Sequence, residues 1–128
     1  MNVLIDTQSI IWFAENNPML SPTARQTIED DGNTCFVSMA SFWEMSIKKN
    51  LGKLDIKGLP LSDFMDEISE NGFLTLDIRR EHVIENERLP LIHRDPFDRL
   101  IIAQAIVDKI VIVSNDSAFD DYSIVRVW

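Results

Sequence analysis

Apolar and polar positions along the chain form two kinds of segment. Short apolar runs typical of buried strands occur at residues 2–6, 34–38, 73–78, 110–114 and 124–128. Longer segments with an apolar face, typical of helices, lie between them at residues 8–15, 22–31, 41–51, 61–70, 80–88 and 96–109. Strands that alternate with helices predict an α/β fold, in which a mostly parallel sheet carries helices on both of its faces.

Polar residues and glycines indicate where these helices begin and end. Ser21 before Pro22, and Asp95 before Pro96, each place a capping side chain ahead of a proline in the first helical turn. Glycine ends a helix readily because it adopts the left-handed conformation without strain. On this basis three helices should end near Gly32, Gly52 and Gly72.

Composition limits the class of protein. The 128 residues fit one domain, and an apolar content of 45% is enough for a buried core. No apolar run approaches the ~20 residues of a membrane span, and the N-terminus lacks a basic leader. The single cysteine, Cys35, lies in an apolar run and cannot form an intrachain disulfide. We therefore expect one domain over residues 1–128 that works in the cytoplasm, away from membranes.

Four acidic residues stand where a carboxylate is costly. Asp6 ends one apolar strand and Asp116 follows another. Glu44 lies inside the apolar stretch 42–45, and Asp98 opens the apolar run of the last long helix. A buried carboxylate must be paired, hydrogen-bonded, protonated or bound to a metal ion. The four acids together indicate a shared cation site, and hence phosphate chemistry.

Each acid also has a purely structural explanation. Asp6 fits the N-cap of the helix that follows it, and Asp116 fits a turn. Ser41 and Glu44 have the spacing of a capping box, in which the glutamate bonds back to the backbone of the cap. Asp98 lies in a first helical turn, where the helix dipole favours a carboxylate. Capping alone does not require all four acids to lie beside core segments, which favours the cation site.

The net charge of −9 argues against a surface that holds nucleic acid by bulk electrostatics and favours a basic partner. A bound divalent cation would reverse the sign of the charge locally. The one basic stretch is either a path for a nucleic-acid backbone or a solvated face, and it contains Lys48, Lys49, Lys53 and Lys57. Lys48 also follows Glu44 by one helical turn and can pair with it.

The two histidines lie in different settings. His82 is expected on a helix surface, whereas His93 and Arg94 lie in a loop that either contacts phosphate or simply holds its own shape. The chain has no P-loop, no glycine-rich dinucleotide motif and no Cys/His zinc spacing. These absences leave carboxylates and a hard cation as the favoured chemistry.

Several motifs resemble those of the PIN-domain nucleases, specifically the VapC-type toxins of bacterial toxin–antitoxin pairs. They are Leu4-Ile5-Asp6-Thr7, Ser41-Phe42-Trp43-Glu44-Met45, His93-Arg94-Asp95-Pro96-Phe97-Asp98-Arg99 and Val113-Ser114-Asn115-Asp116. The resemblance covers essentially the whole chain, and the third motif is its most specific part. The chain departs from the family at Gln8, where histidine is common, and at Ser114, where many members have threonine. Neither departure touches the four acids.

The resemblance implies a PIN-like three-layer α/β/α sandwich and a Mg²⁺- or Mn²⁺-dependent endoribonuclease. The catalytic residues would also hold the metal that activates water for phosphodiester cleavage, and they are Asp6, Glu44, Asp98 and Asp116. Whether Asp116 binds a second ion or orients the water stays open. The residues expected to contact the RNA substrate are Thr7, Lys48, His93, Arg94, Ser114 and Asn115.

A VapC-type toxin also implies protein partners. One is a small cognate antitoxin that blocks the cleft, and the other is a second copy of the chain in a homodimer formed through helices. Two further roles on the same fold stay open at this point. They are an RNA-processing nuclease without an antitoxin, and an inactive PIN module that only binds a partner.

Overall fold

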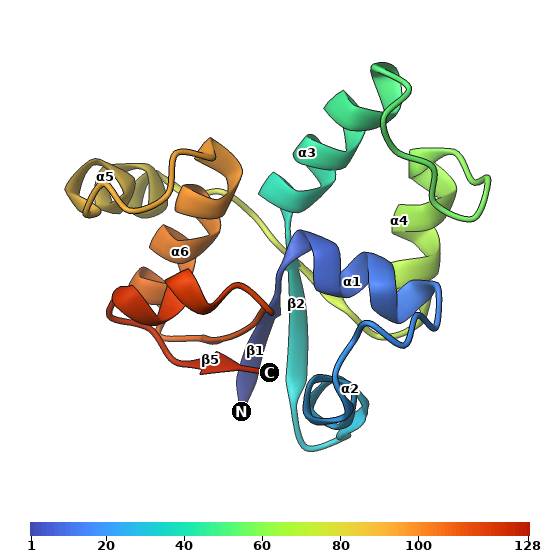
Figure 1. Ribbon diagram of the computed structural model, residues 1–128, viewed down its shortest axis with the longest axis horizontal. Coiled ribbons are helices and arrows are strands. Elements are labelled where there is room, and N and C mark those ends of the chain that lie inside the picture. The colour runs from blue at the N-terminus through green and yellow to red at the C-terminus, as the bar shows by residue number, and fades with distance from the viewer.

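The computed structural model describes residues 1–128 as helices around one central sheet (Figure 1). The strands are β1 (Asn2–Ile5), β2 (Thr34–Ser38), β3 (Leu74–Leu76), β4 (Val111–Val113) and β5 (Arg126–Val127). The helices are α1 (Thr7–Ala14), α2 (Pro22–Glu29), α3 (Met39–Asn50), α4 (Leu61–Glu70), α5 (Arg80–Arg88), α6 (Pro96–Asp108) and the short 3₁₀ helix η1 (Ser117–Asp121). All strands run parallel, in the order β3-β2-β1-β4-β5, which confirms the predicted α/β class.

Helices cover both faces of the sheet. Helices α1 to α4 lie on one face, and α5, α6 and η1 lie on the other (Figure 1). Side chains along β1 alternate between the two cores, with Val3 and Ile5 in one and Leu4 in the other. All three are fully buried, as expected for a parallel strand covered on both sides. None of the helices combines the length and the hydropathy that crossing a bilayer would need.

The strand order places a crevice at the centre of the sheet. The chain steps from β1 through β2 to β3, then returns to the other side of β1 to form β4 and β5. Ligands of such sheets bind outside the carboxyl ends of the strands where this direction reverses, here between β1 and β4. Asp6 follows β1 directly and donates its backbone N–H to Val113 of β4 (3.1 Å). Asp116 comes shortly after β4, so both acids stand at the expected crevice.

Helix α3 begins earlier than the sequence predicted. Its N-cap is Ser38, the last residue of β2, whose hydroxyl accepts a hydrogen bond from the backbone N–H of Ala40 (3.0 Å). Ser41 therefore lies inside the helix and is fully buried, and the predicted capping box with Glu44 is wrong. The strand runs directly into the helix, so the cap lies at the end of the strand. The strands predicted at 73–78, 110–114 and 124–128 are shorter than expected because their neighbours pair with only part of each run.

The prediction of a surface position for His82 is also wrong. Its ring is fully buried where α5 packs on α6. Nδ1 accepts the backbone N–H of Arg79 (3.0 Å), and Nε2 lies 3.1 Å from a carboxylate oxygen of Asp108. Gln104 of α6 lies beside the ring and accepts the hydroxyl of Ser38. A polar network thus connects the cap of α3 to α6, and its members satisfy one another.

Asp108 makes the stability of this region pH-dependent. Burial alone would raise its pKa, but hydrogen bonds from Arg79 and His82 outweigh burial and hold the pKa below its ordinary value. The ionised form therefore stabilises the fold above about pH 4, and this contribution is lost as the pH falls through the lowered pKa. We expect Asp108→Asn to reduce the free energy of unfolding at neutral pH by roughly 1–2 kcal/mol, a modest value because Arg79 is half-exposed.

Chemical denaturation of both proteins at about pH 7 and about pH 3 measures this effect, since the ordinary pKa of aspartate lies between these values. The difference between wild type and variant should shrink at the lower pH. Asp31→Asn, at an exposed side chain without a hydrogen bond, is the matched control and should change little. A loss of equal size at both pH values would contradict the role given to the Asp108 charge.

Candidate active site

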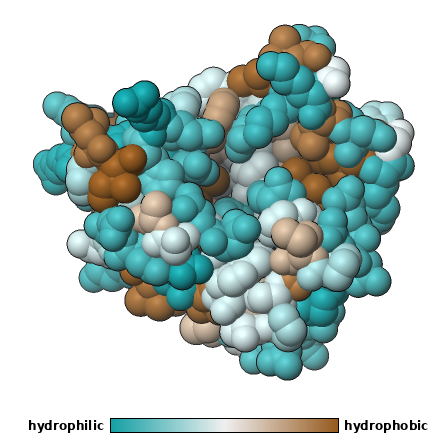
Figure 2. Space-filling view, viewed as in Figure 1, coloured by the Kyte–Doolittle hydropathy of each residue, from teal (hydrophilic) through white to brown (hydrophobic).

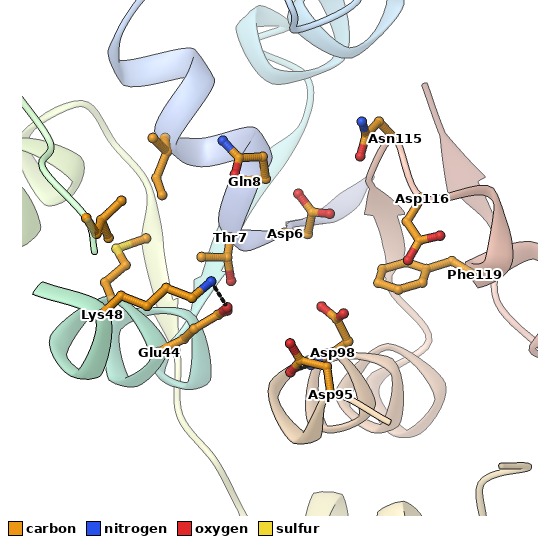
Figure 3. A pocket seen from close by; sticks show the side chains of 13 residues that line it. Asp6, Thr7, Gln8, Glu44, Lys48, Asp95, Asp98, Asn115, Asp116 and Phe119 are labelled. Carbon is orange, nitrogen blue, oxygen red and sulfur yellow. Dashed lines mark hydrogen bonds and ion pairs between the residues drawn. The ribbon is translucent and has the colours of Figure 1, made fainter. Parts of the chain in front are cut away.

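A cleft opens at the carboxyl edge of the sheet, between the part of the molecule that carries α6 and the part that carries α3 (Figure 2). Its volume is about 280 Å³. It is lined by Asp6, Thr7, Gln8, Ile11, Glu44, Met45, Lys48, Leu54, Asp95, Asp98, Asn115, Asp116 and Phe119. The four acids that the sequence singled out are all in this set, and their side chains point toward a common space (Figure 3). Lys48 is the only basic residue among them.

Two of the acids are helix caps as well as cleft residues. Asp6 caps α1 through Oδ1, which accepts the backbone N–H of Ser9 (2.9 Å). Asp116 caps η1 in the same way, with Oδ1 accepting the N–H of Ala118 (3.0 Å). Each carboxylate uses one oxygen for the cap while its side chain still lines the cleft. A role as a helix cap and a place in the cleft are therefore compatible for both acids.

Glu44 reaches the cleft from the wall formed by α3. Its side chain is buried, and one oxygen accepts a hydrogen bond from Nζ of Lys48 one turn further along the helix (2.7 Å). The pairing predicted from their spacing is thus confirmed, and this hydrogen bond raises the pKa of Lys48. The hydroxyl of Thr7 donates to that of Ser41 (2.9 Å) and ties the start of α1 to α3. Glu44 consequently has a fixed position relative to the end of β1.

Asp98 is under strong electrostatic strain. The predicted cap of α6 is confirmed, because Oδ1 of Asp95 accepts the backbone N–H groups of Phe97 and Asp98 (2.8 and 3.2 Å). The carboxylate of Asp98 itself accepts no hydrogen bond. Burial first, and then repulsion from Asp95 and Glu44, raise its pKa to about 7. The ionised form of Asp98 therefore needs a nearby positive charge.

The donor set fits a hard divalent cation. Burial raises the pKa of Asp6 as well, against hydrogen bonds from Ser114 and from the first turn of α1 that lower it. Ligand atoms of His93, Asp98 and Asp116 all lie within 4.8 Å of one another. Mg²⁺ and Mn²⁺ prefer carboxylate oxygens, and clustered carboxylates with raised pKa values gain most from such an ion.

The residues expected to contact substrate fall into two groups. Three line the cleft: Thr7, Lys48 and Asn115. The other three do not. Ser114 is fully buried next to Asp6, and Arg94 is exposed outside the cleft. His93 lies behind Asp116, with Nε2 2.7 Å from its Oδ2.

Sequence reasoning missed part of the cleft. The sequence favoured Asp95 as the cap of α6 over a metal ligand, and the structure shows that it caps α6 and also lines the cleft. Its spacing of three residues from Asp98 places the two side chains on neighbouring positions of the first helical turn, which was the available signal. Phe119 contributes an apolar wall from η1, a short helix that the sequence pattern did not indicate.

Replacement of Asp98 should stabilise the protein in the absence of metal. The raised pKa means that its ionised form destabilises the fold, so stability falls as the pH rises from about 4 to about 7. We expect Asp98→Asn to raise Tm by roughly 3–8 °C at about pH 8, and by less near pH 5 where the wild-type carboxyl is already protonated. Calorimetry in EDTA measures the change.

Asp63→Asn is the matched control. Asp63 also lies in a first helical turn, that of α4, but it is exposed and outside the cleft. This variant loses the interaction with the helix dipole without relieving repulsion, so its Tm should stay level or fall slightly. An Asp98→Asn protein no more stable than wild type at about pH 8 would contradict the strain assigned to the cleft.

The chain is similar to several solved structures over nearly its whole length. The chain is similar to VapBC2 from Rickettsia felis bound to a promoter DNA fragment, with 16% identity, coverage of 98% of this chain and 97% of that chain, and a TM-score of 0.74. It is similar to VapBC-1 from nontypeable Haemophilus influenzae, with 16% identity, coverage of 98% and 96%, and a TM-score of 0.65. A toxin–antitoxin complex from Klebsiella pneumoniae matches at 15% identity, coverage of 94% and 92%, and a TM-score of 0.54. At such low identity these likenesses concern the fold.

Family membership rests on the sequence match. No curated protein matches the chain. The model of the PIN domain family matches residues 3–125, which is nearly the whole chain and includes all four acids of the cleft. The chain therefore belongs to the PIN domain family.

Proposed function

We propose that this protein is a Mg²⁺- or Mn²⁺-dependent endoribonuclease of the VapC type that acts as the toxin of a toxin–antitoxin pair. The observation that carries the proposal is the convergence of four carboxylates, from four separate elements, on one cleft. Membership of the PIN domain family supports nuclease chemistry. The similar solved structures are toxin–antitoxin complexes, which supports the biological role.

The residues of the cleft have distinct roles in the proposed reaction. Asp6, Glu44 and Asp98 would hold the ion, and Asp116 lies beside them. A bound Mg²⁺ or Mn²⁺ supplies positive charge to the phosphate oxygens and lowers the pKa of the attacking water. The chain contributes rigidity, because the caps and the Glu44–Lys48 pair fix the carboxylates before substrate arrives. A preorganised site of this kind needs little rearrangement during the reaction.

Binding of RNA relies on the cleft rather than on a basic surface. In the lysine-rich stretch, Lys49 donates to the carbonyl of Leu59 (2.8 Å) and Lys57 pairs with Glu67 (2.6 Å). These contacts favour a structural role for most of the stretch over a path for the nucleic-acid backbone. With a net charge of −9, the affinity for phosphate then depends on the metal ion and on Lys48.

The outer surface supports the proposed protein partners. Large exposed apolar side chains recur at helical spacing along α3, and they are Trp43, Ile47 and Leu51. Figure 2 shows apolar atoms at the projecting end of this helix. Such a stripe suits a homodimer formed through helices, and the acidic cleft suits a basic segment of an antitoxin. We further propose that residues 1–128 act as one nuclease domain.

Cleavage of RNA by the purified protein tests the catalytic proposal. A mixed RNA pool should be cut in the presence of Mg²⁺ or Mn²⁺, and cutting should stop in EDTA. We expect Asp6→Asn to lower the cleavage rate at least about 100-fold, because it removes a charged oxygen from the metal site. Asp63→Asn, which keeps the cleft intact, should cut at the wild-type rate.

The outcomes separate the parts of this proposal. Cutting that persists in EDTA would contradict metal dependence, and equal cutting by the Asp6→Asn variant would contradict the assigned site. Absence of cutting together with absence of Mn²⁺ binding in calorimetry would remove the catalytic proposal and favour a partner-binding module.

Growth measurements test the role as a toxin. Expression of the wild-type chain in a bacterial host should arrest growth, whereas expression of Asp98→Asn should not. Co-expression of the small open reading frame next to the gene should restore growth and yield a complex that copurifies. Growth that continues at full rate despite RNA cleavage in vitro would instead indicate an RNA-processing nuclease.

A further inference from the structure

His93 connects the cleft to a set of aromatic residues behind it. It lies in the loop between α5 and α6, and its Nε2 is 2.7 Å from Oδ2 of Asp116. Its Nδ1 is 2.8 Å from the hydroxyl of Tyr122. The imidazole stacks on the ring of Tyr122 (centroids 5.4 Å apart) and meets Phe119 edge-on (5.0 Å). The ring is thus held on two faces and at both nitrogens.

The hydrogen bonds around His93 assign its tautomer. The backbone N–H of His93 donates to the hydroxyl oxygen of Tyr122 (2.9 Å), so the hydroxyl hydrogen is free to donate elsewhere. The acceptor in reach is Nδ1 of the same histidine. With Nδ1 accepting, the proton of the neutral imidazole is on Nε2, which donates to the carboxylate of Asp116. The direction of these hydrogen bonds follows from Asp116, because its carboxylate can only accept a hydrogen bond. Nε2 of His93 therefore donates to Asp116, and Nδ1 accepts from Tyr122.

Arg99 fixes the loop that carries His93. Its guanidinium donates to four backbone carbonyls, those of Asn86, Leu89, Pro90 and His93, at 2.9 to 3.4 Å. Arg99 directly follows Asp98 on α6. The loop and the helix that carries Asp98 are therefore tied together. His93 in turn ties both to Asp116, which lies between β4 and η1.

We propose, on the basis of the nuclease function above, that His93 is a positioning residue that holds Asp116 in the cleft through an Nε2–H donor and does not bind metal or substrate itself. Asp116 needs this support, because its side chain is 41% exposed and its cap uses only Oδ1. The proximity of His93 to Asp98 and Asp116 would also suit a metal ligand. In the assigned tautomer Nε2 carries the proton and the lone pair of Nδ1 faces Tyr122, so neither nitrogen directs a lone pair into the cleft.

Nuclear magnetic resonance of ¹⁵N-labelled imidazoles tests the tautomer without any activity. The chain has two histidines, and the structure gives both an Nε2–H that faces an aspartate, so His82 is an internal control. In metal-free protein both neutral rings should be Nε2–H tautomers. Tyr122→Phe should shift the population of His93 and leave His82 unchanged. Protonation of His93 at Nδ1, or loss of its Nε2–H signal on addition of Mg²⁺, would overturn the proposal.

Variants at His93 test the positioning role through metal affinity and kinetics. His93→Leu should weaken Mn²⁺ binding or lower kcat about 10- to 100-fold, as is usual for residues that orient ligands. KM should change little, and His93→Gln, which keeps an N–H donor, should recover part of the loss. Leu91→Ala is the matched control, because Leu91 lies in the same loop but is 93% exposed and outside the cleft, so this variant should keep the wild-type kcat.

Each outcome decides the role of His93 independently of the proposed function. A rise in KM with unchanged kcat in His93→Leu would identify a substrate contact instead. Wild-type Mn²⁺ affinity together with wild-type kcat would also overturn the proposal. If the wild-type protein cuts no RNA, the proposed function fails, while the tautomer and the Mn²⁺ affinity still decide whether His93 holds Asp116.

Discussion

Repulsion among carboxylates that the fold brings together is the constraint on which the rest of this structure depends. Asp6, Glu44, Asp98 and Asp116 share one cleft with Lys48 as the only cation in its lining. Burial has weakened their hydration, so like charges interact more strongly there than in water. Burial first, and then repulsion from Asp95 and Glu44, raise the pKa of Asp98 to about 7. A divalent cation bound among these carboxylates would offset the repulsion between them.

The N-termini of three helices stabilise the negative charge of the carboxylates in the cleft. Asp6, Asp95 and Asp116 are the N-caps of α1, α6 and η1, so the positive ends of three helices meet at the carboxyl edge of the sheet. Backbone N–H groups donate to these carboxylates, and the helix dipoles favour their negative charge. The same hydrogen bonds therefore cap the N-termini of these helices and orient the carboxylates. A role as an N-cap and a place in the lining of the cleft are therefore compatible for the same carboxylate.

Polar side chains buried away from the cleft hold its two walls together. Ser38 caps the helix that carries Glu44 and bonds to Gln104 on the helix that carries Asp98. Arg99 binds the loop of His93 to the same helix. These contacts are satisfied at both ends, so they add specificity to the packing of α3 on α6 without leaving unpaired groups. Residues that do not line the cleft thus help to set the separation of the acids.

Local sequence patterns predicted much of the fold and the four acids of the cleft. The apolar runs and the capping signals of Ser21 and Asp95 depend on neighbouring residues, and they predicted the order of the elements and most helix boundaries. The burial argument selected the four acids, because a carboxylate inside an apolar run is costly wherever the run is placed. The resemblance in the run from His93 to Arg99 led to the PIN family.

The sequence by itself determined the alternation of strands and helices and the identity of the acids, since both follow from contacts within a few residues. Only the tertiary structure decided that His82 is buried and that His93 bonds Asp116. The partners of these rings, Asp108 and Asp116, lie 26 and 23 residues away along the chain. A polar side chain is stable in a core only when another element of the fold provides its hydrogen-bond partner. A local sequence pattern does not show which element that is.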